Sequence, residues 1–253
     1  MPQSLFAFDE IPNLLIFDKI DSTSKEIFRM IDNGFASNGD IVIADVQTEG
    51  HGRSGRVWES QHGNLFASFL LQANLPIEKM TFVGFLLAKN TIQTLKEVSS
   101  DKGVFSFKWP NDILLNNKKV TGILIQSNLE SVTNICNSMV CGLGINVKCH
   151  PNYVESTDLF HELQIIADKN EILFSILQKF ETEYQKYLEL NDMTEILTFL
   201  KNNSNFIGNE ISVHSGQTIK KGICKDIDKT GNLILLTGDK EEVIFSADVI
   251  NLV

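Results

Sequence analysis

The sequence predicts an α+β fold, in which a mixed β-sheet flanked by helices is followed by a small C-terminal β-barrel. Apolar residues recur at strand and helix periods up to about residue 203. Beyond a polar stretch at 201–205, short β-rich runs alternate with turn residues. A length of 253 residues with 43% hydrophobic and 21% charged residues is typical of a globular chain. We therefore expect two domains, at residues 1–203 and 204–253.

Predicted helices and strands alternate in the first part of the chain. Asp21–Ser24 supplies capping residues before apolar residues at helical spacing, which predicts a helix start. The β-branched run Ile41–Val46 predicts a buried strand, and Leu65–Leu71 predicts the next one. The apolar residues of Ile77–Val98 recur at helical spacing, so we expect a long helix on the sheet.

The following segment is predicted to be mostly β-structure. Phe105–Trp109 alternates large apolar residues with polar ones, which is the period of a half-buried strand. Ile113–Leu115 and Val120–Ile125, separated by Asn116–Asn117, predict a hairpin. Val132–Val147 predicts one more strand.

Two helices are predicted before the C-terminal barrel. Amphipathic spacing places them at Ile172–Leu190 and Met193–Leu200. Turn residues then recur at Ser215–Gly216, Lys229–Asn232 and Gly238–Asp239. This spacing is that of a small antiparallel barrel.

Charge and composition exclude several classes of protein. The chain has 22 Lys+Arg and 32 Asp+Glu, a net charge of −10, which argues against binding nucleic acid through its phosphates. Cys136, Cys141, Cys149 and Cys224 form no CxxC pair, so we expect reduced, mostly buried thiols. The N-terminus has no basic region, and no apolar run approaches the ~20 residues that span a bilayer. We expect a cytoplasmic location.

The loop after the strand at Ile41–Val46 carries the most informative motif. Gly50, Gly52 and Gly55 match the GxGxxG pattern of dinucleotide sites. That pattern requires a helix after the glycines, whereas a strand is predicted here. We therefore set the dinucleotide interpretation aside.

The same loop has the composition of a flexible anion-binding loop. Its glycines let the backbone fold closely over a ligand, and the guanidiniums of Arg53 and Arg56 can pair with phosphate or carboxylate oxygens. Trp58 offers a flat face on which a purine could stack. A solvated turn with incidental arginines is the alternative.

Two further stretches bring polar residues to predicted strand ends. Asn111 and Asp112 could hold Mg²⁺, which prefers carboxylate and phosphate oxygens, or could form an ordinary turn. Lys119 could reach a phosphate or carboxylate, or could be an ordinary edge-strand lysine. The glycines of Gly142–Val147 allow close backbone approach, and Asn146 could bond a ribose or phosphate; a plain strand end is the alternative.

Taken together and in this order, these stretches resemble the biotin protein ligases (biotin–[acetyl-CoA-carboxylase] ligases). That family shows a GRGRxGRxW-like loop, a KWPND segment, a lysine before a GIL-like strand and a GxGxN strand end. The resemblance covers nearly the whole chain. It implies a class II synthetase-like catalytic domain and an SH3-like C-terminal barrel. Because the sequence begins close to the catalytic domain, we expect the monofunctional type without a DNA-binding domain.

The resemblance implies a ligase reaction in two steps, with ATP and Mg²⁺ as co-substrate and metal. The carboxylate of biotin attacks the α-phosphate of ATP and gives biotinyl-5′-AMP and pyrophosphate. The ε-amine of a lysine on the biotin carboxyl carrier domain of a biotin-dependent carboxylase then attacks the acyl carbon and expels AMP. The implied partners are biotin, ATP and this carrier, without nucleic acid or membrane, and a homodimer is left open.

Roles for individual residues are also implied by the resemblance. Cations must offset the repulsion between the two reacting anions, so Lys119, Arg53 and Arg56 are implied to be catalytic. Asp112 is implied to be a magnesium ligand or an acid–base group. The implied biotin site consists of Ser22, Thr23, Gln47, Gly50, His51, Arg53, Lys119 and Gly122. The implied ATP site consists of Arg53, Arg56, Trp58, Asn111, Lys119 and Asn146.

One position departs from the family pattern, because His51 stands where arginine is usual. An imidazole carries less charge at neutral pH than a guanidinium. We expect weaker ordering of the loop by ligand, and a His51→Arg variant to retain the adenylate longer.

Three other functions remain as alternatives. A lipoate or octanoate ligase of the same fold would need a longer acyl tunnel. A non-catalytic binding module would use the barrel as an adaptor, although the intact Lys119, Arg53, Arg56 and Trp58 argue against a decayed ligase. A transcriptional repressor would need a pair of DNA-reading helices, which the sequence does not show.

Overall fold

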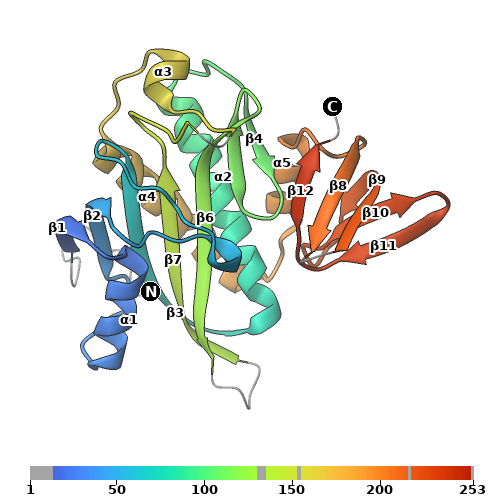
Figure 1. Cartoon of the computed structure of the whole chain (residues 1–253). Coiled ribbons are helices and arrows are strands. Elements are labelled where there is room, and N and C mark those ends of the chain that lie inside the picture. Colours follow the sequence, from blue (N-terminus) through green and yellow to red (C-terminus); the bar gives the residue numbers. More distant parts are fainter. Residues whose placement is uncertain (1–13, 130–134, 153–154, 216–217, 252–253) are drawn as a thin grey trace.

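A seven-stranded mixed sheet forms the centre of the molecule (Figure 1). The computed structural model describes residues 14–129, 135–152, 155–215 and 218–251. The sheet has the order β1-β2-β3-β7-β6-β5-β4. Its strands are β1 (Leu14–Ile20), β2 (Ile41–Gln47), β3 (Leu65–Pro76), β4 (Phe105–Lys108), β5 (Asp112–Leu115), β6 (Lys118–Leu129) and β7 (Ile135–Ile145).

The first two strands are parallel, and every other neighbouring pair in this sheet is antiparallel. A parallel pair needs a crossover connection, which is supplied here by helix α1 (Thr23–Asp32). We predicted the helix start correctly but missed strand β1. The run Leu14–Phe17 is apolar, but its residues are only half-buried or exposed at the sheet edge, and the pairing with β2 that makes it a strand is not a local signal.

Side chains on alternate faces of the sheet pack against different helices. Val42, Leu70 and Val140 form a small core with α1, whereas Phe69 and Cys141 belong to the larger core on the opposite face. Because successive strand residues point to opposite faces, one strand contributes to both cores.

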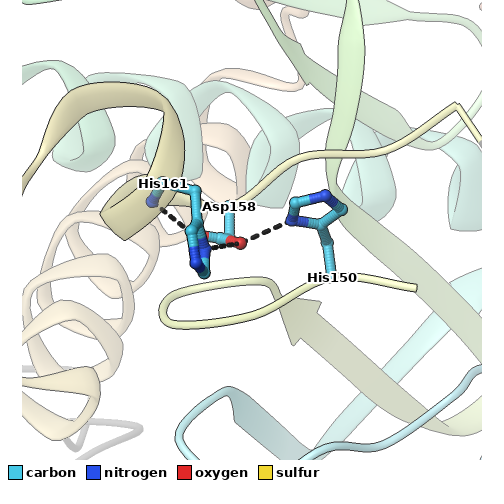
Figure 2. Close-up of side chains that lie close together, drawn as sticks. All are labelled: His150, Asp158 and His161. Carbon is cyan, nitrogen blue, oxygen red and sulfur yellow. Dashed lines mark hydrogen bonds and ion pairs between the residues drawn. The ribbon is translucent and has the colours of Figure 1, made fainter. Parts of the chain in front are cut away.

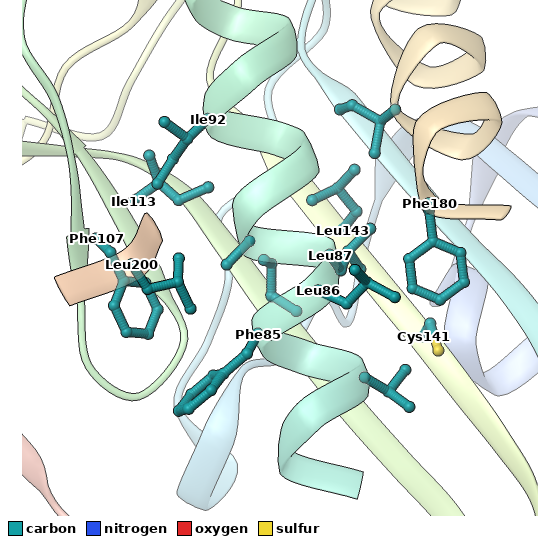
Figure 3. Close-up of a cluster of buried hydrophobic side chains, with 14 of the residues drawn as sticks. Phe85, Leu86, Leu87, Ile92, Phe107, Ile113, Cys141, Leu143, Phe180 and Leu200 are labelled. Carbon is teal, nitrogen blue, oxygen red and sulfur yellow. The ribbon is translucent and has the colours of Figure 1, made fainter. Parts of the chain in front are cut away.

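The larger core is built around the long helix α2 (Met80–Val98). Phe85, Leu86 and Leu87 of α2 pack against the sheet, and Phe180 of helix α4 (Lys169–Leu190) lies beside them (Figure 3). The ring centroids of Phe85 and Phe107 are 5.4 Å apart in an edge-to-face arrangement. Helix α5 (Thr194–Asn202) completes this layer.

Several predicted boundaries need adjustment. Strand β3 continues five residues beyond Leu71, to Pro76, and the helix predicted from Ile77 begins with a 3-10 turn, η2 (Ile77–Lys79). The strand predicted at Val132–Val147 is β7, of which residues 132–134 lie outside the described residues. The half-buried prediction for Phe105–Trp109 is wrong because Ser106 is also buried, so β4 is covered on both faces.

The C-terminal segment forms a five-stranded antiparallel sheet in the order β11-β10-β9-β8-β12. Its strands are β8 (Glu210–Ser215), β9 (Thr218–Ile227), β10 (Leu233–Thr237), β11 (Lys240–Ile244) and β12 (Asp248–Asn251). Its apolar residues join the larger core, and Trp109 Nε1 donates a 2.9 Å hydrogen bond to the carbonyl oxygen of Gly231. The predicted α+β fold with a small β-unit at the C-terminus is confirmed.

The described part of the chain has no helix that is both long and apolar enough to cross a membrane.

Candidate functional site

A pocket of about 290 Å³ opens on the α1 face of the sheet. Its floor is formed by β6 and β7, and the N-terminal turn of α1 lies at one end. The loop between β2 and β3, residues 48–64, crosses this face (Figure 1). We call these residues the glycine–arginine loop.

The glycine–arginine loop is folded back on itself as a hairpin. The Gly52 amide donates to the carbonyl oxygen of Arg56 at 2.7 Å, and the tip contains the 3-10 turn η1 (Arg53–Gly55). Gly55 has φ of +72°, in the left-handed region that favours glycine. A Cβ on Gly50 would lie 2.6 Å from the Trp58 carbonyl oxygen, so this glycine allows the two arms of the loop to approach.

Trp58 lies flat on two paired glycines of the sheet. Gly122 of β6 and Gly144 of β7 are partners in the antiparallel register. A Cβ on either glycine would lie 2.6 Å from a ring atom of Trp58. The indole Nε1 is buried without a hydrogen-bond partner among the described residues. A ligand acceptor could satisfy this donor.

A β-bulge positions Lys119 in the pocket. The register between β5 and β6 shifts between Ile113 and Leu114, so one extra residue is inserted in β6. As a result Val120 and Ile123, three positions apart, both belong to the larger core. Lys119 and Gly122 share the opposite face and both line the pocket.

The Lys119 ammonium lies between an acid and an aromatic ring. Its Nζ is 2.7 Å from Asp112 Oδ1, although the angle does not meet hydrogen-bond geometry. The same Nζ lies 5.3 Å from the centroid of the Trp58 ring. The side chain of Lys119 is 32% exposed, so an incoming anion can reach it.

Arg53 and Arg56 join the loop to the C-terminal sheet. Arg53 Nη2 donates to Ser246 Oγ at 2.7 Å, and Arg56 Nη2 donates to Asp248 Oδ1 at 2.8 Å. Burial lowers the pKa of the Arg53 guanidinium from its ordinary value, and the nearby Asp248 partly opposes that shift. Because burial disfavours the charged guanidinium, an anion that pairs with Arg53 would be bound favourably.

The two asparagines predicted for the site hold neighbouring backbone. Asn111 Nδ2 donates to the Ile123 carbonyl oxygen at 2.7 Å, and its Oδ1 accepts from Arg53 Nη1 at 3.3 Å. Asn146 is buried, and its Nδ2 donates to the Thr157 carbonyl oxygen at 3.0 Å.

At the α1 end, the pocket has a buried polar wall. The Thr23 amide donates to Gln47 Oε1 at 2.9 Å, and Thr23 Oγ1 lies 2.8 Å from Ser68 Oγ. Ser24 Oγ lies 2.9 Å from the same Ser68 hydroxyl. The predicted cap residue Ser22 begins α1 without a side-chain capping bond.

All but one of the predicted site residues line this pocket. The exception is Gly50, which is buried behind Trp58. Sequence reasoning missed Ser24 and Ser68 in the polar wall, and Ser246 and Asp248 beside the loop. Ser68 could have been found as the one polar residue in the apolar run Leu65–Leu71.

The side chains around Asp112 suit a magnesium ion that arrives bound to a nucleotide. They suit a permanently bound magnesium ion less well. Mg²⁺ usually takes one or two carboxylates and completes its shell with water and phosphate oxygens. Asp112 supplies one carboxylate, which already faces Lys119 at 2.7 Å. The Asn111 side chain is engaged at both of its polar atoms.

Two family models match the chain. Residues 16–146 match the biotin/lipoate A/B protein ligase family, and residues 206–250 match the biotin protein ligase C terminal domain.

Similar proteins are known from several bacteria. The chain is 32% identical to the bifunctional ligase/repressor BirA of Bacillus subtilis, over 94% of this chain and 73% of that protein. It is 26% identical to a biotin–[acetyl-CoA-carboxylase] ligase of Mycobacterium tuberculosis, over 91% of this chain and 86% of that protein. Among solved structures, a biotin protein ligase from Aquifex aeolicus in complex with biotin and ATP matches with a TM-score of 0.78 at 28% identity. That match covers 94% of this chain and 98% of the other.

Proposed function

The chain belongs to the biotin/lipoate A/B protein ligase family, and from this premise we propose how its pocket works as a biotin protein ligase. Its activity is the ATP-dependent attachment of biotin to protein, as in the similar ligases that carry both domains. We assign roles in this activity to side chains that line the pocket.

We assign biotin to the α1 end of the pocket. The ring of biotin is a cyclic urea, with two N–H donors and one carbonyl acceptor. The polar wall of Thr23, Ser24, Gln47 and Ser68 presents hydroxyl and amide groups that complement both. Ser22 and the backbone of Gly122 complete this end of the site.

The acid group of biotin then extends toward Lys119. In the first half-reaction the carboxylate oxygen bonds to the α-phosphorus of ATP, and pyrophosphate leaves with the electrons of the broken P–O bond. Both reactants are anions, so positive charge must offset their repulsion. Lys119 supplies it at the sheet, and Arg53, Arg56 and in part His51 supply it from the loop.

For Lys119 to act on the phosphate, its contact with Asp112 must loosen. The ammonium lies 2.7 Å from the carboxylate. A nucleotide phosphate can replace Asp112 as the partner of Lys119. This exchange would free the carboxylate for the Mg²⁺ that accompanies ATP, and the ion would add positive charge at the phosphates.

The nucleotide lies on the other side of Lys119, beneath the glycine–arginine loop. Trp58 offers its ring face to the adenine, and its unpartnered Nε1 is available to an acceptor. Asn111 and Asn146 hold the strand ends around this part of the site.

In the second half-reaction the acceptor is a lysine on a biotin carboxyl carrier domain. Its neutral ε-amine attacks the acyl carbon of biotinyl-5′-AMP, forms the amide and releases AMP. We place the domain boundary between residues 203 and 204, directly after α5 ends at Asn202. The C-terminal domain then contacts the glycine–arginine loop through Ser246 and Asp248.

A single observation supports these roles: the β6 bulge turns Lys119 to the pocket face of the sheet, where it lines the same pocket as the polar wall and the loop. The test is biotin-dependent exchange of labelled pyrophosphate into ATP, with lipoate as a control substrate. We expect Lys119→Ala to lose exchange by several orders of magnitude. Lys118→Ala, which removes an exposed surface ion pair with Glu162, is the matched control and should keep it.

Near-normal exchange by Lys119→Ala would contradict the role of this lysine. Exchange with lipoate in place of biotin would contradict the assignment of the polar wall. Mass spectrometry of a carrier domain incubated with the protein, biotin and Mg·ATP tests the second half-reaction directly.

A further inference from the structure

A second cluster of chemically active side chains lies outside the pocket. The segment between β7 and helix α3 (Leu159–Leu163) contains His150 and Asp158, and α3 itself contains His161 (Figure 2). The carboxylate of Asp158 lies between the two imidazole rings (Figure 2). None of these three residues has a role in the ligase reaction proposed above.

The distances within the cluster are short. His150 Nδ1 lies 2.5 Å from Asp158 Oδ2, and His161 Nδ1 lies 2.8 Å from the same oxygen. One ligand atom from each residue can be chosen so that all three lie within 4.8 Å of one another. The second oxygen, Asp158 Oδ1, accepts the backbone amide of His161 at 2.7 Å.

Asp158 is a buried carboxylate whose side-chain partners are two imidazoles. Its side chain has 0% exposure, and burying an unpaired carboxylate is strongly unfavourable. In the part of the chain that the structure describes, its ion-pair partners are these two histidines, with no lysine or arginine. A buried carboxylate with an imidazole nitrogen on each side is a ligand set that a metal ion can use.

We propose that His150, Asp158 and His161 form a binding site for a divalent transition-metal ion of the zinc type. Two imidazole nitrogens and one carboxylate oxygen are ligands that Zn²⁺ prefers. Tetrahedral ligands at about 2.0–2.2 Å from zinc lie roughly 3.3 Å apart, so the two N–O distances must each widen slightly. His161 is 59% exposed and can rotate, and its exposure leaves the fourth position open to water.

Such an ion would hold the ends of a segment that borders the ligase pocket. Between His150 and Asp158, Pro151, Glu155 and Ser156 line that pocket. The Lys119 amide donates to the Glu155 carbonyl oxygen at 3.1 Å. Metal binding is therefore expected to make the backbone beside Lys119 more rigid. The proposed metal site is separate from the site assigned to Mg·ATP.

The test is titration of the chelator-treated, full-length protein with ZnCl₂ in the absence of biotin and ATP. Calorimetry should give one zinc per chain, and thermal unfolding should move to higher temperature. MgCl₂ at the same concentration should have no effect, because Mg²⁺ prefers oxygen ligands.

Variants distinguish this cluster from other histidines. We expect His161→Gln, a change at an exposed side chain, to weaken zinc binding by at least about tenfold. His214→Gln in the C-terminal sheet is the matched control and should bind zinc as the unmodified protein does. Cys149→Ser should also leave binding unchanged, and the Co²⁺-loaded protein should show tetrahedral d–d bands without a thiolate charge-transfer band.

Two results would overturn the proposal. One is the absence of zinc binding at micromolar concentrations. The other is equal zinc affinity in His161→Gln and the unmodified protein, which would place the ion elsewhere.

Discussion

Two glycines determine where the Trp58 ring lies. Gly122 and Gly144 are cross-strand partners, and a side chain at either position would collide with the ring. We predict that Gly144→Ala displaces Trp58, because the new Cβ would lie 2.6 Å from Trp58 Cε2. Affinity for ATP should fall by about 1–3 kcal/mol, the range for loss of a base–aromatic stack. Titration of intrinsic fluorescence with ATP measures the change.

Gly84→Ala provides the control for this substitution. Gly84 lies within α2, and its nearest neighbour would be 3.4 Å from the added Cβ, an ordinary contact. This variant should bind ATP normally. If Gly144→Ala also bound ATP normally, the ring of Trp58 would not be the adenine platform.

At this scale the sequence predicted most of the pocket and missed part of its polar wall. Lys119 stands out in the sequence because it lies in a predicted strand. Arg53 and Trp58 stand out because a glycine-rich loop that is both basic and aromatic is unusual. Ser24 and Ser68 are ordinary serines in the sequence. Only the packing of α1 on β3 brings their hydroxyls to 2.9 Å.

The N-terminal end of α1 depends on an acid that precedes it. Asp21 accepts two bonds from Arg29, at 2.8 Å and 2.9 Å, and the amide of Ser22 at 2.7 Å. The hydrogen bonds from Arg29 lower the pKa of Asp21 from 3.8 to about 2. A lowered pKa means that the folded state favours the carboxylate more strongly than the unfolded state does.

We therefore predict that Asp21 stabilises the fold above its unfolded pKa of 3.8 and that this contribution is lost as the pH falls toward about 2. Asp21→Asn should lower the free energy of unfolding at pH 7 by about 1 kcal/mol or less, since the pair with Arg29 is partly exposed. Urea unfolding of both proteins from pH 7 downward measures the difference.

Asp32→Asn, at the other end of α1, is the control for this pH dependence. It should show no comparable difference, because Asp32 has no ion pair in the described part of the chain. A constant gap between Asp21→Asn and the unmodified protein down to about pH 2 would contradict the prediction.

Two arginines of the glycine–arginine loop contact the C-terminal part of the chain. Arg56 pairs with Asp248, and both side chains are partly exposed. A surface pair of this kind contributes about 0–1 kcal/mol, which corresponds to a change of up to roughly fivefold in loop opening. We predict that Asp248→Asn speeds trypsin cleavage after Arg53 and Arg56 in the ligand-free protein by up to that factor.

Asp239→Asn, in the turn between β10 and β11, is the matched control for trypsin cleavage and should not change its rate. Saturating biotin and ATP should slow cleavage in both variants. Equal cleavage rates for Asp248→Asn and the unmodified protein would show that the pair does not restrain the loop.

Elements with strong periodicity were predicted well, and irregular ones were not. The helices at 80–98 and 169–190 and the hairpin turn at Asn116–Asn117 follow from local patterns. The bulge in β6 could not be predicted, because Lys118–Ile125 has the sequence of one continuous strand and the extra residue is visible only against β5. Strand β1 was missed for a similar reason, since its stability comes from pairing with β2.

For the whole molecule, the sequence predicted two structural units but not how they share a core. The larger hydrophobic core contains residues of α2, α4 and the C-terminal sheet together. Gly231, in a turn of that sheet, packs against Thr81 and Phe85 of α2. Long-range contacts of this kind leave no local signal, because each partner is only an apolar or turn residue in the sequence.

This shared core leads to a prediction about unfolding. Trp109 Nε1 donates to the Gly231 carbonyl oxygen at 2.9 Å, and the ring is 2% exposed. We expect the two sheets to unfold in one cooperative transition, and Trp109→Phe to lower the free energy of unfolding by about 1–3 kcal/mol, since it leaves a buried carbonyl unpaired. Tyr184→Phe is the control, because its buried hydroxyl has no partner in the described residues and its removal should cost little. Urea unfolding followed by far-UV circular dichroism measures both changes. Two separate transitions in the unmodified protein, or equal stability losses in the two variants, would show that this contact does not couple the sheets.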